Sequence, residues 1–463
     1  MSTNGPRDFR PRAHFSARKN WINDPNGLIF YGGEYHMFFQ YSPSGTTWGP
    51  MHWGHATSHD LVHWQEQDIA LYPDALGTIF SGCAVLDEHN TSGLGVLGKP
   101  PLVLIFTHNQ PPREAKVQQQ SVAYSLDGRH FIKYLGNPVI PSPGIRDFRD
   151  PKVFWDQRRG RWSMVLAVDD QVWFYASPDL LHWEKTGSFG PGESLVKDAW
   201  WECPDLFELP CEEGGSRWVL LVSRYLNPAR GGSRTEYFIG QFDGDRFVCT
   251  EPADHPLWLD DGFDFYAATS FSQVKEKLFM AWAGNWAYAP AAPTGEYCGV
   301  MALPRRFELR TTPQGHRLAQ RFAGIQQLVS QVEPLSSGAC LPREFFGLRI
   351  RGTGAGSVRL CNGRGEQLEL GVTSNNEFFM DRQQAGLSAF YPTFAQPHLA
   401  RSVRPRPCQG DWCVELVFDV SICEALCDQG LISVTQTVYP GAAYDTILFS
   451  ENLQVEYIDM EQT

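Results

Sequence analysis

Short runs of aromatic and β-branched residues recur along the first half of the chain. Examples cover residues 34–41, 102–107, 162–168 and 218–223. Each run is shorter than a typical helix, and enrichment in aromatic and branched residues at that length is typical of strands. The pattern therefore predicts a mainly β structure built from short strands.

A second pattern follows these runs and marks a repeat. The sequence Ser-x-Asp-Leu-x-His-Trp occurs at residues 58–64 and again at 177–183, and looser copies occupy 125–131 and 241–247. A turn with Asp, closed by an aromatic residue, is the expected outer hairpin of a repeated unit. A fifth unit without this signature covers residues 264–304. Five units of four strands predict a five-bladed β-propeller, in which the first strand of each blade lines the central channel.

The pattern changes after about residue 335. Alternating apolar and polar residues occur in segments such as 346–351, 367–372, 414–420 and 431–438. This alternation predicts short antiparallel strands, for which a β-sandwich is the expected architecture. The fold class is therefore predicted as all-β, with the propeller followed by a C-terminal sandwich.

Chain length supports a division into two domains. The 463 residues exceed what one hydrophobic core usually supports. We expect a propeller over residues 1–305, a linker over 306–335 and a sandwich over 336–463. Residues 318–332 have a helix-like pattern, which predicts that the linker is helical.

Three acidic residues stand in distinctive segments far apart in the sequence. Asp24 lies in Trp-Ile-Asn-Asp-Pro-Asn-Gly, Asp150 in Phe-Arg-Asp-Pro, and Glu202 in Trp-Glu-Cys-Pro-Asp. The nearby prolines favour extended backbone around the acids. Each acid heads one predicted blade, at the place that residues 80–82 and 264–266 occupy in the second and fifth units. Because equivalent positions meet by symmetry, all three carboxylates are predicted at one end of the channel.

These acidic segments carry a family resemblance. Together with residues 80–82, 264–267 and 379–382, they resemble the motifs of glycoside hydrolase family 32, the group of invertases, inulinases and levanases. The resemblance spans nearly the whole chain, although residues 418–424 depart from the family's usual segment at that place. It implies a propeller with a C-terminal sandwich, in agreement with the strand pattern.

The resemblance also implies a role for each acid. Asp24 would be the nucleophile, Glu202 the general acid and base, and Asp150 a non-covalent group that binds sugar hydroxyls. The reaction independently requires such groups, because cleavage of a glycosidic bond with retention needs one attacking carboxylate and one carboxylic acid. A third negative charge would help to keep the acid protonated near neutral pH.

Residues beside the three acids are candidates for substrate binding. Aromatic residues make up 13% of the chain, so most of them must pack between blades. Those expected near the acids would hold a sugar ring, and polar neighbours would bind its hydroxyls, as the family assigns to its fructose subsite. The candidates are Asn23, Gln40, Trp48, Phe80, Ser81, Arg149, Tyr266 and Trp286.

Charge and composition exclude several other functions. A formal net charge of −13 argues against nucleic acid or an anionic membrane as a partner. No apolar run has the length of a membrane-spanning helix, and the first residues lack the apolar stretch of a signal peptide. We therefore expect a cytoplasmic enzyme that acts on a small carbohydrate; whether it forms a homo-oligomer is left open.

The cysteines predict neither a disulfide framework nor a metal site. They number eleven, are scattered, and form no compact paired spacing. Cys423 and Cys427 are four residues apart, and Cys408 and Cys413 are five apart, but no histidines complete a zinc pattern around them. Free thiols are expected, and we predict no metal and no cofactor.

The sequence as a whole predicts a retaining β-fructofuranosidase that releases fructose from the non-reducing end of sucrose or short fructo-oligosaccharides. One alternative is a fructosyltransferase of the same family, in which a sugar hydroxyl replaces water as the acceptor. A more remote alternative is a non-catalytic sugar-binding propeller. The preference among sucrose, fructan and phosphorylated sucrose is not fixed by the sequence.

Overall fold

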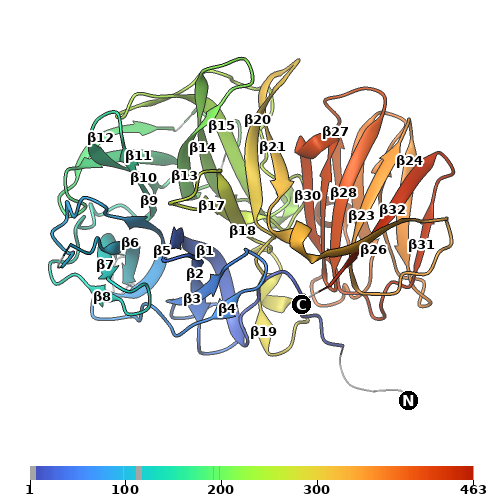
Figure 1. Cartoon of the computed structure of the whole chain (residues 1–463), viewed down its shortest axis with the longest axis horizontal. Helices are drawn as coiled ribbons and strands as arrows, with labels where there is room; N and C mark the ends of the chain where they lie inside the picture. The colour runs from blue at the N-terminus through green and yellow to red at the C-terminus, as the bar shows by residue number, and fades with distance from the viewer. Residues whose placement is uncertain (1–6, 97, 111–116, 191, 198, 462–463) are drawn as a thin grey trace.

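The computed structural model places a five-bladed β-propeller beside a β-sandwich (Figure 1). It describes residues 7–96, 98–110, 117–190, 192–197 and 199–461. The predicted all-β fold class is confirmed. The first six residues, on which the expectation about a signal peptide depends, lie outside the described range.

Each blade is an antiparallel sheet whose strands follow one another in the chain. Blade one contains β1 (Asn20–Tyr31), β2 (Glu34–Ser42), β3 (His52–Ser58) and β4 (Gln65–Glu66); blade two contains β5 (Thr78–Leu86), β6 (Leu102–Gln110), β7 (Val117–Ser125) and β8 (Ile132–Lys133). Blade three contains β9 (Phe148–Asp156), β10 (Arg161–Val168), β11 (Gln171–Ser177) and β12 (Glu184–Phe189); blade four contains β13 (Trp201–Pro210), β14 (Ser216–Tyr225), β15 (Ser233–Phe242) and β16 (Phe247–Cys249). Blade five contains β17 (Tyr266–Ser270), β18 (Leu278–Trp282), β20 (Arg305–Thr312) and β21 (Gly315–Phe322).

The repeated sequence signature forms the turn between the third and fourth strands of a blade. In blade one, the Ser58 hydroxyl accepts a hydrogen bond from the backbone N–H of Leu61, and Asp60 accepts from the N–H groups of Val62 and His63. Leu61 adopts a φ of 75°, a conformation that the surrounding hydrogen bonds must hold because it is unfavourable for a branched residue. Blade three repeats these contacts around Asp179. The signature is therefore structural, as predicted.

The first strands of the five blades form the inner ring. Strands β1, β5, β9, β13 and β17 contact their neighbours in that order, and β17 returns to β1. The ring is also closed by β19 (Tyr297–Cys298), a short strand in the loop between β18 and β20 that pairs in parallel with β1. This arrangement brings the start of every blade to one end of the channel.

Two sheets form the sandwich. One has the order β22 (Val329–Pro334), β32 (Leu453–Met460), β23 (Phe345–Gly352), β28 (Trp412–Asp419), β29 (Ile422–Cys427) and β30 (Ile432–Thr437). The other has the order β27 (Arg401–Pro405), β26 (Glu377–Gln384), β25 (Gln367–Val372), β24 (Gly356–Cys361) and β31 (Thr446–Phe449). Alternate residues of both sheets, including Phe346, Leu370 and Phe418, form one apolar core between them. The alternation read from the sequence thus reports the two inner faces.

The predicted helical linker over residues 306–335 is wrong. Most of that range is strand: β20 and β21 complete blade five, and β22 is an edge strand of the sandwich. Within residues 318–332, all of which the structure describes, the only helical element is the 3₁₀ turn η3 (Ile325–Leu328), whose Ile325 and Leu328 are buried. Pairing with neighbouring sheets overrides the local helix-like pattern, because it satisfies the backbone groups that a helix would pair internally. The propeller accordingly extends to Phe322.

The remaining described helices are short. They are η1 (Pro228–Arg230), η2 (Ala289–Ala291), η4 (Asp428–Gly430) and the single-turn α1 (Pro397–Ala400). Within the described residues, no helix is long and apolar enough to span a bilayer.

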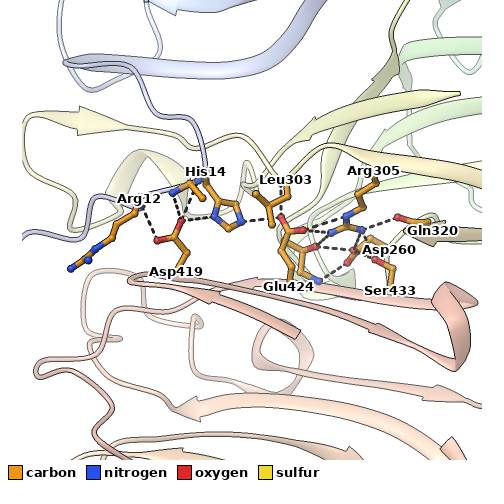
Figure 2. Close-up of polar contacts among 11 residues, drawn as sticks. Arg12, His14, Asp260, Leu303, Arg305, Gln320, Asp419, Glu424 and Ser433 are labelled. Atoms are coloured by element: carbon orange, nitrogen blue, oxygen red, sulfur yellow. Dashed lines mark hydrogen bonds and ion pairs between the residues drawn. The ribbon is translucent and has the colours of Figure 1, made fainter. Parts of the chain in front are cut away.

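A group of buried charged residues joins the propeller to the sandwich (Figure 2). We call His14, Asp260, Arg305, Asp419 and Glu424 the interface network. Arg305, at the start of β20, donates to Glu424 of β29 at 2.9 Å and contacts Asp260 at 3.2 Å. His14, before β1, contacts Asp419 at 2.8 Å through Nδ1 and Glu424 at 3.2 Å through Nε2. The N-terminal segment, the propeller and the sandwich therefore share one set of ion pairs.

Candidate active site

All five inner strands are irregular at the same place. The pairing register shifts between Ile22 and Pro25 in β1, between Ile79 and Gly82 in β5, and between Glu202 and Asp205 in β13. Equivalent shifts occur opposite Arg149 in β9 and after Tyr266 in β17. A bulge re-aims side chains that a regular strand would point into the sheet. Every predicted motif of the propeller coincides with one of these bulges, whereas the motif at 379–382 lies on β26 of the sandwich.

The backbone at the bulges is strained in three blades. Asp150 has a φ of 63°, Cys203 of 45° and Ala267 of 54°. The extended conformation expected at Asp150 from the following proline is therefore wrong. Positive φ is costly for residues other than glycine and persists where the surrounding structure imposes it. Here each of the three backbone N–H groups donates to a side chain of the preceding blade: Asp150 to Thr107, Cys203 to Asp150 and Ala267 to Ser223.

A cavity of about 730 Å³ opens beside these bulges. It contains all three predicted catalytic residues and most of the predicted binding residues. The predicted residues that line it are Asn23, Asp24, Gln40, Trp48, Phe80, Ser81, Arg149, Asp150, Glu202 and Trp286. Tyr266 is the exception, because it is only 1% exposed and lies behind the wall of the cavity. As the symmetry of the repeats predicted, the fold brings together residues that are far apart in sequence, by up to 263 positions from Asn23 to Trp286.

Asp24 is buried and surrounded by hydrogen-bond donors. Its Oδ1 accepts from the Asn23 side chain at 3.0 Å, and its Oδ2 accepts from the Ser81 hydroxyl at 2.7 Å and from the Cys203 thiol at 3.3 Å. Burial raises the pKa of Asp24, and the charge of Glu202 adds to that increase, whereas the three donors lower it. The donors therefore favour the ionised form that a nucleophile requires.

Glu202 has a different set of hydrogen-bond partners. One oxygen accepts from Arg149 Nη2 at 2.9 Å, and the other accepts from the Tyr266 hydroxyl. Its side chain keeps 20% of its surface exposed, compared with 6% for Arg149. Glu202 is thus the more accessible carboxylate, fixed in orientation by two donors from blades three and five.

Asp150 shares a neighbour with each of these two acids, Cys203 with Asp24 and Arg149 with Glu202. Its Oδ2 accepts from the backbone N–H of Cys203 at 3.0 Å, and Arg149 Nε lies 3.7 Å away. Burial raises the pKa of Asp150 to about 7; Arg149 opposes the increase, while the negative charges of Glu202 and Asp24 add to it. We call Asp24, Asp150 and Glu202 the carboxylate cluster.

Arg149 is the cation that contacts two of the three acids in the carboxylate cluster, Asp150 and Glu202. Besides Glu202 and Asp150 it contacts Asp147, which also lines the cavity. Attraction to these carboxylates outweighs burial and raises the pKa of Arg149, so its charge is permanent. The sequence analysis expected Arg149 to bind substrate; the structure shows that most of its donors are already used to orient acids.

Aromatic residues form the walls of the cavity. Trp48 packs edge-on against Phe80 with ring centroids 6.1 Å apart, and Trp286 stacks on Trp21 at 5.6 Å. Trp48 is 49% exposed, so its ring stands at the open rim. An apolar wall opposite a set of carboxylates and amides is the composition expected of a sugar-binding pocket.

Sequence reasoning missed several lining residues. They are Asn109, Arg146, Asp147, Trp200 and Tyr225. Trp200 and Asp147 flank the motifs of Glu202 and Asp150, so their closeness in sequence was a usable signal. Asn109 and Tyr225 stand at the ends of β6 and β14, and no local pattern marks them. Only the arrangement of the blades brings them to the cavity.

One group of metal-ligating side chains lies outside this cavity. Among the described residues, Cys211, Glu213 and His316 approach closely enough to hold an ion. Both ring nitrogens of His316 are already in contact with carboxylates, Nδ1 with Glu251 and Nε2 with Glu213 at 2.6 Å. These ion pairs between hairpins of blades four and five account for the group without a metal.

Comparison with known proteins agrees with this geometry. A model of the glycosyl hydrolases family 32 N-terminal domain matches residues 14–321, and one of the family 32 C-terminal domain matches residues 342–462. The N-terminal match ends within β21, in agreement with a propeller that includes β20 and β21.

Individual relatives cover nearly the whole chain. A levanase of Bacillus subtilis (strain 168) is 38% identical over 94% of this chain and 67% of its own length. An extracellular exo-inulinase of Aspergillus niger is 35% identical over 94% of this chain and 90% of its own. The crystal structure of an exo-inulinase from Aspergillus awamori superposes with a TM-score of 0.89 and 30% identity, covering all of both chains. With two domain matches, an intact carboxylate cluster and relatives that are themselves glycosidases, the chain belongs to glycoside hydrolase family 32.

Proposed function

We propose that this glycoside hydrolase is a retaining β-fructofuranosidase that releases terminal fructose from β-fructans and sucrose. The observation that carries the proposal is the unequal environment of two acids in one cavity. Asp24 is buried among three donors that favour its ionised form, whereas Glu202 is more exposed and faces the cavity. A retaining glycosidase requires this division between a nucleophile and an acid.

The reaction follows from these environments. Asp24 attacks the anomeric carbon of the terminal fructosyl unit, while Glu202 gives a proton to the departing oxygen. The bond from that carbon to the leaving sugar breaks, and a covalent fructosyl ester forms on Asp24. Water, deprotonated by Glu202, then attacks the same carbon and releases fructose and the Asp24 carboxylate. Asp150 binds ring hydroxyls more strongly as positive charge develops on the sugar.

The charge of the cavity supports a neutral substrate. Among the described lining residues, the cations are Arg146 and Arg149, and four carboxylates line the same cavity. Arg149 is bonded to acids, and Arg146 is an exposed side chain 3.8 Å from Asp147. A phosphorylated sucrose would meet a surplus of negative charge. Neutral sucrose and fructans carry no such penalty.

The rim of the cavity supports oligosaccharides. Trp200 is 39% exposed and stacks on Tyr225 with centroids 5.4 Å apart and planes 18° apart. Both rings line the cavity. An exposed, stacked aromatic pair offers a flat apolar surface to the sugar units beyond the terminal fructose, and sucrose has fewer such units than a longer chain. The levanase and exo-inulinase relatives are named for polymeric fructans.

Product analysis tests the proposed reaction. Incubation with sucrose and with inulin-type and levan-type oligosaccharides should release free fructose one unit at a time, and NMR at early times should show the β-anomer first. Accumulation of longer oligosaccharides in concentrated sucrose would indicate a fructosyltransferase. Binding without any product would indicate a non-catalytic sugar-binding propeller. First release of the α-anomer would exclude retention.

A chain-length series tests the preferred substrate. Trp200→Ala should lower kcat/KM on tetrasaccharides by roughly fivefold to tenfold, and on sucrose much less, because about 1 kcal/mol of stacking is lost. Tyr72→Ala is a matched control, since Tyr72 is also exposed but does not line the cavity. Equal losses on sucrose and tetrasaccharide would reject the fructan preference.

A further inference from the structure

A buried arginine of the sandwich reaches into the propeller close to the active site. Arg382, on β26, has a fully buried side chain. Its Nη1 donates to Asp264, at the head of blade five, and to the carbonyl of Thr437 at 2.9 Å. Its Nη2 donates to the Tyr288 hydroxyl at 2.7 Å and to the carbonyl of Leu399 at 2.6 Å. One side chain of the sandwich thus holds two separate loops of blade five.

The three groups form a closed triangle. Tyr288 accepts from Arg382 and donates its hydroxyl proton to Asp264 Oδ1 at 2.7 Å. Asp264 Oδ2 also accepts from the backbone N–H of Thr437 at 2.9 Å. The guanidinium lies 4.0 Å from the centre of the Phe394 ring, so its face is covered as well. A buried carboxylate and a buried cation tolerate this environment only because they are paired and hydrogen-bonded.

Each loop held by the triangle carries one side chain that belongs to the cavity wall or contacts a residue of that wall. Two residues after Asp264 stands Tyr266, whose hydroxyl donates to Glu202. Two residues before Tyr288 stands Trp286, which forms a wall of the cavity. Tyr266 is only 1% exposed and does not line the cavity, so it reaches substrate only through Glu202. Arg382 of the sandwich therefore contacts two residues that each lie two positions along the chain from an active-site residue. One of these is Tyr266, the donor to the proposed acid, and the other is Trp286 in the cavity wall.

We propose that Arg382 is a positioning residue for catalysis, and that the sandwich completes the active site by fixing Tyr266 against Glu202 and Trp286 in the cavity wall. The inference rests on the proposed function, in which Glu202 protonates the leaving oxygen. Without the guanidinium, Asp264 keeps a buried charge with no cation beside it, and the head of blade five must rearrange to relieve it. A displaced Tyr266 would leave the Glu202 carboxyl free to rotate away from the leaving oxygen.

Leaving-group dependence distinguishes positioning from a structural role. An aryl β-fructofuranoside with a good leaving group needs little proton donation, whereas sucrose needs full protonation. A variant that only lowers the folded fraction reduces both rates equally. Arg382→Met should lower the ratio of kcat for sucrose to kcat for the aryl substrate by roughly tenfold, because the two substrates share the later attack by water and differ in their need for the impaired protonation.

A second buried arginine provides the control. Arg406 is bound to Asp428 at 2.9 and 3.0 Å within the sandwich, and it has no contact with blade five's head among its hydrogen bonds in the described residues. Arg406→Met removes a comparable ion pair and should leave the ratio unchanged. Tyr288→Phe, which keeps Arg382 paired with Asp264, is a milder test if Arg382→Met does not fold, and it should lower the ratio by about threefold.

The outcomes separate this inference from the proposed function. Glu202→Ala is measured in parallel. If that variant lost the same fraction of kcat on sucrose and on the aryl substrate, Glu202 would be rejected as the acid. If Glu202→Ala behaves as an acid variant but Arg382→Met and Tyr288→Phe leave the ratio at the wild-type value, the positioning role of Arg382 is refuted. A lowered ratio in Tyr266→Phe alone would show that Tyr266 acts without help from the sandwich.

Discussion

The active site and the interface network are both groups of buried charge, but they are built in opposite ways. In the interface network, the two cations His14 and Arg305 pair with three carboxylates. Asp260 and Asp419 also accept hydrogen bonds from several backbone N–H and hydroxyl groups. In the carboxylate cluster, Asp150 and Glu202 share Arg149 with Asp147, and the printed partners of Asp24 are the neutral donors Asn23, Ser81 and Cys203. Burial raises the pKa of Asp150 to about 7, whereas at the interface burial of Glu424 is outweighed by Arg305 and His14, and its pKa is lowered.

This difference separates stability from function. The interface pairs its charges and holds two domains together, while the active site keeps acids close to one another at a cost to the folded state. The cost appears twice, as carboxylates with raised pKa and as left-handed backbone at Asp150 and Cys203. We therefore expect substitutions in the cluster to reduce activity while sparing or raising stability, and substitutions in the interface network to do the reverse.

The largest effect is expected at Asp24, the proposed nucleophile. Asp24→Ala should lower kcat at least about 10⁴-fold on every substrate, because no covalent intermediate can form. The melting temperature should not fall, since a buried carboxylate with raised pKa is removed. Steady-state rates on sucrose and on an aryl fructofuranoside, with calorimetry of the same samples, check both statements. Retention of activity on the aryl substrate would contradict the role of Asp24.

The next effect concerns Asp150. Asp150→Asn should lower kcat by about 10²- to 10³-fold with little change in KM, because the lost contact, worth about 3 to 4 kcal/mol, acts mainly in the transition state. If KM rose while kcat stayed intact, Asp150 would be an ordinary binding group. The mechanism would then require two carboxylates instead of three.

The same variant tests whether the carboxylate cluster lowers the unfolding free energy of the protein. A carboxyl group with a higher pKa in the folded chain stabilises the fold below its unfolded pKa of 3.8, and this contribution is lost as the pH rises to about 7. Asp150→Asn cannot ionise, so at neutral pH it should be more stable than the wild type, by at most about 4 kcal/mol. Denaturant unfolding at pH 4 and pH 8 measures the difference. If the variant and the wild type differed in unfolding free energy by the same amount at pH 4 and at pH 8, the raised pKa of Asp150 would be rejected.

A substitution in the interface network should instead lower the stability of the fold. Burial alone would lower the pKa of His14, but bonds and attraction to Asp419 and Glu424 raise it to about 9. A cation with a raised folded pKa contributes stability that is complete below pH 6.5 and lost as the pH rises through about 9. His14→Gln should therefore cost about 3 kcal/mol at pH 6 and much less at pH 9.5, with kcat of the folded enzyme unchanged. A loss independent of pH would mean that His14 is neutral.

The smallest effect is expected in the repeated turns, which belong to neither group. Asp60→Ala removes the acceptor for the N–H groups of Val62 and His63 and should cost about 1 kcal/mol in unfolding free energy. Asp179→Ala, in the equivalent turn of blade three, should cost about the same. Activity should change in neither variant. Very different losses would show that the two copies are not energetically equivalent.

The repeat explains how much of the site could be predicted. Because each blade has the same order of strands, equivalent positions in sequence become neighbours around the channel, and the motifs at 24, 150 and 202 had to converge. The same logic did not identify Asn109 or Tyr225, which come from second strands. It also placed Tyr266 in the cavity, whereas the structure places it behind Glu202.

By itself, the sequence determined the strands, the five repeats, the sandwich and the three acids, because all of these depend on local patterns and on symmetry. Only the tertiary structure decided that residues 306–322 belong to blade five, since sheet pairing there overrides a local helix-like pattern. The positive φ of Asp150 and the link from Arg382 through Asp264 to the active site were likewise beyond the sequence. Both depend on contacts between residues far apart in the chain, and such contacts form only when the blades and the sandwich have packed together.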